Sequence, residues 1–245
     1  MERKIHIFLI VFMHYFGIAD AQNRVSIYNA YNASDMIAWK KTIDRMESNP
    51  DKSNVFRLEL LNYQYGYIAW CIGEKKAENA RKYLKIAENH LGFLENEMYK
   101  LTEIYAYKAA FVGYEIGISP YKAPFIGQKS LKYAEKSVNI DSTNALGYIQ
   151  LGNIKFYSPV VLGGSKEIAI KHYLKALDIM EENTALIEQN WNYLNLLGTI
   201  ITAYKEVGNY SLARDYCNKA LKIAPEFDWV KNKLYPEISE SYYNK

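Results

Sequence analysis

The sequence predicts an all-α fold built from pairs of packed helices. Apolar residues recur at steps of three and four over most of the 245-residue chain, as they do on one face of a helix. Small residues such as Ala169 and Ala176, or Ala213 and Ala220, stand where two helices would approach closely. Pro225 follows one such segment, and a helix must end there because proline cannot continue the hydrogen-bond ladder.

The composition is that of an ordered protein with no nucleic-acid partner. Hydrophobic residues make up 49% of the chain and charged residues 23%, which argues against disorder. The net charge of +3 gives no basic field that would attract nucleic acid. His90 and His172 do not stand in a metal-binding spacing, so we expect no metal and no cofactor. Cys71 and Cys217 are expected to be small buried side chains that do not pair.

Residues 1–21 have the pattern of a secretory signal peptide. A basic start and an apolar run over residues 5–18 precede Ala19 and Ala21, the small residues of a cleavage site. The alternatives are a buried first helix or an uncleaved anchor, but the run is shorter than the roughly 20 residues that span a bilayer. We therefore expect one periplasmic or secreted domain, residues 22–245, without stable membrane insertion.

Caps and breakers place helices along this domain. Ser34 is expected to cap a first helix that Pro50 ends, and this helix would cover the N-terminal side of the stack. Four helical pairs are expected between Ser53 and Pro225. A terminal helix over residues 227–234, ended by a proline, would cover the apolar face of the last pair.

The last pair carries the clearest repeat motif. Ala213, Cys217, Ala220 and Pro225 fall at relative positions 20, 24, 27 and 32 of a tetratricopeptide unit when Tyr204 is placed at position 11. This resembles the tetratricopeptide (TPR) family. The resemblance implies a right-handed solenoid of helical hairpins, here with extra capping helices at both ends.

The preceding pair matches the same family at six positions. Places 4, 7, 8, 20, 24 and 27 of the unit are taken by Tyr148, Leu151, Gly152, Ala169, Tyr173 and Ala176. The two earlier pairs match more loosely. The spacings between successive units along the whole series are 50, 39 and 44 residues, none of which equals the 34-residue consensus, so the repeats are degenerate.

Two short stretches resemble particular TPR proteins. The proline and double-glycine turn over residues 157–165 resembles that of the accessory subunits of tripartite (TRAP) transporters. Residues 225–230, together with the leader and the 23 tyrosines, are similar to small periplasmic TPR proteins of Bacteroidetes type. The first resemblance implies a small solute held near residues 159–164, and the second implies a role in the cell envelope.

The TPR resemblance also implies a binding groove. In peptide-binding members the concave face is lined by places 2, 5, 9, 12 and 13 of the first helix. Carried over to this chain, these places are Ile149, Asn153, Phe156, Asn195, Gly198, Thr202, Lys205 and Glu206. Asn153 matches the asparagine of the carboxylate-clamp type, but Ile149 stands where that type has lysine. We therefore expect a mixed, uncharged groove.

Motifs for catalysis are weak. Gly163, Gly164, Ser165 and Lys166 are not in the order of a phosphate-binding loop and are better explained as a turn followed by a helix cap. We expect a non-catalytic adaptor that binds a protein or peptide partner in its groove. The alternative is an accessory protein of a solute transport system that binds a small ligand.

Overall fold

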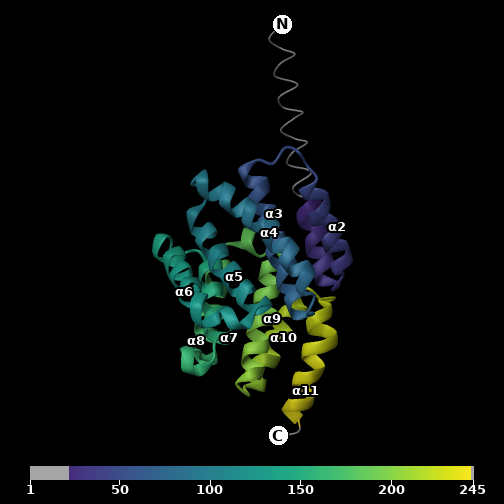
Figure 1. Ribbon diagram of the computed structural model, residues 1–245. Helices are drawn as coiled ribbons and strands as arrows, with labels where there is room; N and C mark the ends of the chain where they lie inside the picture. The colour runs from purple at the N-terminus through teal and green to yellow at the C-terminus, as the bar shows by residue number, and fades with distance from the viewer. Residues whose placement is uncertain (1–21, 244–245) are drawn as a thin grey trace.

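The computed structural model describes residues 22–243, and every regular element in that range is helical (Figure 1). The predicted all-α class is therefore confirmed. The predicted signal peptide, residues 1–21, lies outside the described residues.

Most of the chain forms four neighbouring pairs of helices. Residues 22–32 are helical, and α2 (Met36–Glu47) follows them. The pairs are α3 (Asn54–Gly73) with α4 (Ala77–Asn96), α5 (Leu101–Ile118) with α6 (Ala123–Ile140), α7 (Ala145–Tyr157) with α8 (Lys166–Glu181), and α9 (Trp191–Glu206) with α10 (Tyr210–Ile223). Short 3-10 turns lie in three connections, η1 (Pro120–Lys122), η2 (Val160–Leu162) and η3 (Thr184–Leu186). A π-helical segment, η4 (Trp229–Leu234), runs directly into α11 (Tyr235–Tyr243).

The two helices of a pair are antiparallel. Between α5 and α6, Ser130 Oγ donates to the carbonyl of Ala109 (2.8 Å), and Ser137 Oγ donates to that of Thr102 (2.7 Å). The order of the contacts is thus opposite along the two helices. The predicted pairing of neighbouring helices is confirmed, while the right-handed solenoid stays a prediction.

Small residues lie where helices touch, as their spacing predicts. Ala169, Ala176 and Ala220 are fully buried. Gly152 of α7 packs under the ring of Tyr173 in α8, and a Cβ atom at Gly152 would lie 2.3 Å from that ring. A larger side chain at these positions would have to push the paired helices apart.

The helix ends agree with the sequence in most places. Ser53 caps α3 and Ser165 caps α8, each accepting a backbone N–H bond within the first turn. The prediction for Ser34 is wrong, because Asp35 caps α2 and accepts from two backbone N–H groups at 3.1 and 2.9 Å. Pro236 does not end the terminal helix. It lies in the first turn of α11, which continues the π-helical segment η4 without a break, so the helical stretch runs through the proline.

The buried apolar residues form two large clusters. The first is built mainly by α2 to α5 and includes Trp191 of α9. The second is built by α7 to α11 with η4. Cys71 lies in the first cluster and Cys217 in the second, and both are free and buried, as expected.

The helix over residues 22–32 joins the two ends of the chain. The Tyr31 hydroxyl donates to Asn195 Oδ1 of α9 (2.8 Å). The Tyr31 ring also lies 5.7 Å from that of Trp39, 5.6 Å from that of Trp191 and 5.5 Å from that of Phe227. In Figure 1 the purple N-terminal helices accordingly meet the yellow C-terminal segment. The first helix therefore covers part of the last pair as well as α2.

Candidate functional site

Three of the predicted groove residues lie on α7. Ile149 is buried in the second cluster, whereas Asn153 and Phe156 are half-buried. Phe156 packs edge-on against Tyr157, with ring centroids 4.9 Å apart. Two of the three side chains are thus partly accessible, and their role in binding stays a prediction.

The predicted groove residues on α9 contact elements outside the four pairs. Asn195 accepts the hydrogen bond from Tyr31 of the first helix. Gly198 lies under the ring of Trp229, where a Cβ atom would approach the ring to 2.3 Å. Lys205 forms an ion pair with Glu237 of α11 (2.7 Å).

The other two predicted residues of α9 also have contacts within the chain. The Thr202 hydroxyl donates to the carbonyl of Gly198 one turn earlier (2.8 Å), and Glu206 pairs with Lys166 of α8 (2.6 Å). The predicted residues of α7 and α9 therefore have different neighbours. A binding role for the α9 residues stays a prediction.

A chain of polar side chains crosses from α8 through α7 to α3. The Tyr173 hydroxyl donates to Asn153 Oδ1 (2.9 Å), and Asn153 Nδ2 donates to Gln150 Oε1 (3.2 Å). Gln150 Nε2 in turn donates to the Tyr65 hydroxyl (3.2 Å). Because each group in this buried chain has a partner, the side chains are held in one arrangement. Asn153 is among the predicted groove residues, whereas its neighbours in this chain, Gln150 and Tyr65, which are 85 residues apart, are not.

Aromatic rings surround this polar chain. The Tyr65 ring stacks on that of Tyr114 at 5.5 Å, and the Tyr114 hydroxyl donates to the backbone carbonyl of Tyr65 (3.1 Å). Burial raises the pKa of the Tyr114 phenol well above its usual value, because the phenolate would lie away from water. Both phenols are therefore neutral hydrogen-bonding groups at neutral pH.

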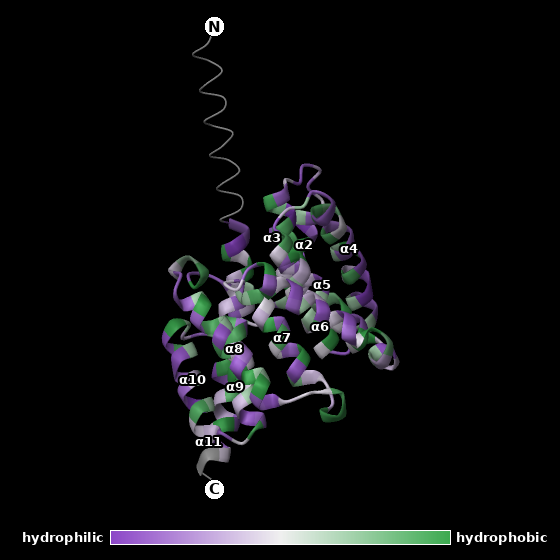
Figure 2. Cartoon of the chain, turned by 90° about the vertical axis from the view of Figure 1, so that its left-hand side faces the viewer, coloured by the Kyte–Doolittle hydropathy of each residue, from purple (hydrophilic) through white to green (hydrophobic). Residues whose placement is uncertain are grey.

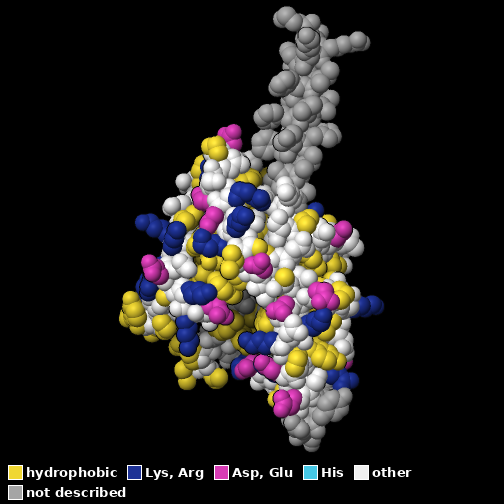
Figure 3. All heavy atoms as spheres, turned by 90° about the vertical axis from the view of Figure 1, so that its right-hand side faces the viewer, with side chains coloured by type: hydrophobic (Ala, Val, Ile, Leu, Met, Phe, Trp, Pro, Cys, Tyr) yellow, Lys and Arg dark blue, Asp and Glu magenta, His cyan; other side chains and the backbone are white. Residues whose placement is uncertain are grey.

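Tyr157 lies one helical turn after Asn153 on α7. Its residue surface is 76% exposed, yet surrounding protein raises the pKa of its phenol, with a further contribution from Tyr65. The Tyr157 side chain is thus largely open to solvent and follows Gln150 and Asn153 along α7. We call Tyr65, Tyr114, Gln150, Asn153 and Tyr157 the inner recess. Figure 3 shows that the molecule is hollowed near the centre of its α2 and α11 side, with hydrophobic side chains around the hollow.

The inserted α7–α8 loop presents apolar side chains to solvent beside the inner recess. Val160, Val161 and Leu162 are 84%, 91% and 59% exposed. In Figure 2 this hydrophobic turn stands away from the rest of the molecule, below α6 and α7.

The backbone of the loop is held firmly. Gly163 adopts a left-handed conformation with φ of 85°, and its carbonyl accepts from Lys155 Nζ (3.0 Å). Gly164 lies so close to the Ser158 carbonyl that a Cβ atom would meet that oxygen at 1.9 Å. The predicted turn followed by the Ser165 cap is thus confirmed, and both glycines are needed for it.

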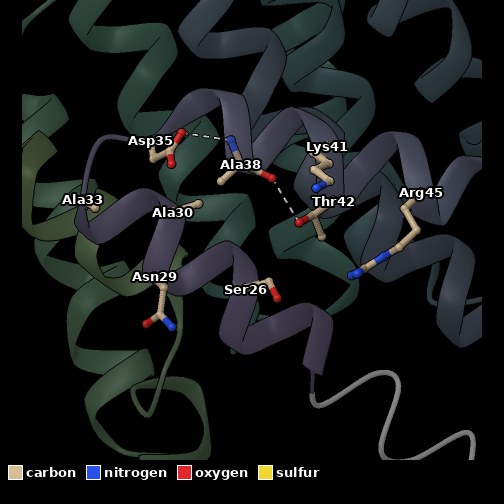
Figure 4. Close-up of a pocket in the computed structure, with 9 residues that line it drawn as sticks. All are labelled: Ser26, Asn29, Ala30, Ala33, Asp35, Ala38, Lys41, Thr42 and Arg45. Atoms are coloured by element: carbon tan, nitrogen blue, oxygen red, sulfur yellow. Dashed lines mark hydrogen bonds between the residues drawn. The ribbon is translucent and has the colours of Figure 1, made fainter.

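A separate pocket of about 580 Å³ lies between the helix of residues 22–32 and α2 (Figure 4). Small and polar side chains line it, among them Ser26, Asn29, Ala38, Lys41 and Arg45. Sequence analysis missed this pocket, because it exists only where the first helix folds back beside α2.

Residues 22–243 contain neither a membrane-spanning helix nor a cluster of metal-binding side chains. No helix there is both long and apolar enough to cross a membrane. No cluster of three or more histidine, cysteine, aspartate or glutamate side chains in the same range could hold a metal ion.

The chain resembles a known structure in its fold. No protein-family model and no curated protein matches the sequence. Among solved structures, the HusA haemophore from Porphyromonas gingivalis superposes with a TM-score of 0.61. The match covers 78% of this chain and 94% of that protein at 14% sequence identity, so the likeness is one of fold.

Proposed function

We propose that this chain is a non-catalytic binding protein of the bacterial cell envelope, and that it holds a planar, mostly apolar ligand in the inner recess. The observation that carries the proposal is Tyr157, a largely exposed ring beside a fully hydrogen-bonded polar chain. Ligand sites typically combine aromatic walls with a few fixed polar groups. The apolar α7–α8 loop adds contact surface beside them.

The ligand class proposed for the first test is a porphyrin. A structural neighbour is described as a haemophore, and a porphyrin has the wide flat face that tyrosine and phenylalanine rings can stack on. Lys166, which pairs with Glu206, lies with its amine 5.8 Å from the centre of the Phe156 ring, so an acidic group of the ligand would have to share this amine with Glu206.

The fold and location that accompany this function are inferences as well. Four antiparallel pairs with TPR-like small residues at their contacts support a degenerate TPR-type solenoid. The leader pattern of residues 1–21 supports export to the periplasm or beyond.

The test is a titration of the mature chain with metal-free protoporphyrin IX and with haemin. Tyr157→Ala should raise the dissociation constant at least about fivefold, because an aromatic pair contributes about 1 kcal/mol beyond its buried area. Tyr121→Ala is the matched control, since Tyr121 is 74% exposed in η1 and lies outside the recess residues. Equal affinities in the wild type and both variants would contradict the proposed site.

A second candidate function is that of a protein adaptor. The protruding apolar loop favours it, because a convex turn fits a groove on a partner better than it encloses a small ligand. Affinity capture from envelope extract tests this candidate. Val161→Asp should abolish capture of a partner that binds the loop and leave porphyrin binding unchanged, whereas capture unaffected by the charge would count against the adaptor.

A further inference from the structure

The pocket between the first helix and α2 is bounded at both ends. At one end the two helices come together at the turn that Asp35 closes as the cap of α2. At the other end Arg45 Nη2 donates to Asn23 Oδ1 across the gap (2.8 Å). Figure 4 shows the side chains of Ser26, Lys41 and Arg45 along the space between the two helices. The pocket is therefore a defined slot on the surface.

The slot has an apolar floor and a cationic end. Ala30, Ala33 and Ala38 bring only methyl groups to it, which leaves its volume of about 580 Å³ free. That volume is within the roughly 300–1,000 Å³ of small-molecule sites. Lys41 and Arg45 lie one turn apart on the wall formed by α2.

The two cations are not neutralised within the described residues. Among residues 22–243 neither side chain forms an ion pair, and the Arg45 guanidinium donates to the neutral side-chain amide of Asn23. The carboxylate of Asp35 lines the opposite end of the slot, where it accepts from the N–H groups of Ile37 and Ala38. The cationic end thus has donors free for an anion.

We propose that this slot binds an amphipathic anion, with its apolar body against the alanine floor and its acidic group on Lys41 and Arg45. Arginine and lysine together offer charge-assisted hydrogen bonds to a carboxylate, sulfonate or phosphate. The slot shares no residue with the inner recess, so this ligand site is independent of the one proposed above.

The experiment uses two fluorescent probes that differ in one group. The anionic probe is 8-anilinonaphthalene-1-sulfonate, and its neutral counterpart is N-phenyl-1-naphthylamine, which lacks the sulfonate. The mature wild type should bind the anionic probe more tightly, and added salt should reduce the difference because it screens exposed charges. Backbone amide NMR shifts should concentrate in residues 22–32 and α2.

Paired variants separate charge from shape. Lys41→Gln with Arg45→Gln should weaken anionic-probe binding roughly tenfold, as two exposed charge pairs predict, and leave the neutral probe unchanged. Arg24→Gln removes a charge from the neighbouring helix outside the slot and should change neither affinity. Ala38→Leu fills part of the slot and should weaken the binding of both probes. Ala33→Leu serves the same purpose if the first variant does not fold.

Two results would contradict the proposal that the slot binds an anion. One is anionic-probe binding that the double charge variant leaves unchanged. The other is a set of probe-induced amide shifts that avoids residues 22–32 and α2. Tyr157→Ala should leave the anionic probe unaffected. If porphyrin binding falls in the charge variant and persists in Tyr157→Ala, the recess assignment fails while the slot stands.

Discussion

The inner faces of α7 and α9 differ although the two helices open successive pairs. On α7, Asn153 and Phe156 remain partly accessible beside the exposed ring of Tyr157. On α9, Tyr31 binds Asn195, and Trp229 packs on Gly198. The repeat register can indicate which residues of a helix are equivalent. It does not indicate whether the ends of the chain fold back over them.

Tyr31, Trp229 and Glu237 contact Asn195, Gly198 and Lys205 of α9, and we call the helix of residues 22–32 together with residues 227–243 the cover of α9. The largest expected effect comes from a substitution at the centre of this cover. Phe227 is fully buried against Tyr31 and Trp229. Phe227→Ala should lower the free energy of unfolding by about 3–5 kcal/mol, because a buried ring is replaced by a cavity. Chemical denaturation measures the loss. Phe125→Ala, at an exposed phenylalanine of α6, should change stability by less than about 0.5 kcal/mol, and equal effects would mean that the cover is not part of the core.

Alanine substitutions at the two close-contact glycines, Gly152 of α7 and Gly198 of α9, compare the two helix faces directly. Gly152→Ala and Gly198→Ala should each destabilise by about 1–3 kcal/mol through overpacking. The effect should be larger at Gly152, because the ring of Tyr173 is fully buried and hydrogen-bonded to Asn153, whereas Trp229 is half-buried and can shift. A larger loss at Gly198 would show that the terminal cover is the more rigid contact.

Tyr31→Phe isolates the hydrogen bond to Asn195 and its dependence on pH. At pH 8 the variant should be less stable by about 1 kcal/mol. Burial raises the pKa of Tyr31 far above its usual value near 10, so the unfolded chain loses this proton first as pH rises. The stability that the neutral phenol provides is complete below pH 10 and is lost above it. The difference in free energy of unfolding between wild type and variant should therefore become smaller from pH 8 to 11. An unchanged difference would contradict burial of the hydroxyl.

The smallest effect is expected from the ion pair at the edge of the cover. Lys205 and Glu237 are both partly exposed, and such pairs contribute at most about 1 kcal/mol. Lys205→Gln should lower the melting temperature only slightly, and high salt should produce the same change in the wild type. A loss as large as that of Phe227→Ala would mean that charge rather than apolar packing holds the cover.

Local features of the fold were predictable from the sequence, and contacts between distant segments were not. Ser53 and Ser165 cap helices because the cap and its partner N–H lie three residues apart. Ala220 is buried because its spacing places it at a helix contact. By contrast, Tyr31 and Asn195 are 164 residues apart. No periodicity links them.

The same distinction applies to the candidate site. Asn153 was among the predicted groove residues because its place is defined by spacing within a single helical pair. Gln150 could not, since its partner Tyr65 belongs to a helix two pairs earlier. The slot beside α2 was equally out of reach, because the segment before Ser34 carries no clear helical period of its own.

The position of Tyr31 has a consequence for synthesis. Its neighbour Asn195 emerges from the ribosome 164 residues later, and Phe227 later still, so the Tyr31 side chain is made long before these two partners. A product truncated before Trp191 would keep Tyr31 next to Trp39 but lack Trp191, Asn195 and Phe227, which cover its other side. Incomplete chains would therefore expose the aromatic ring and the unpaired hydroxyl of Tyr31 on the first helix, a surface that chaperones and proteases recognise.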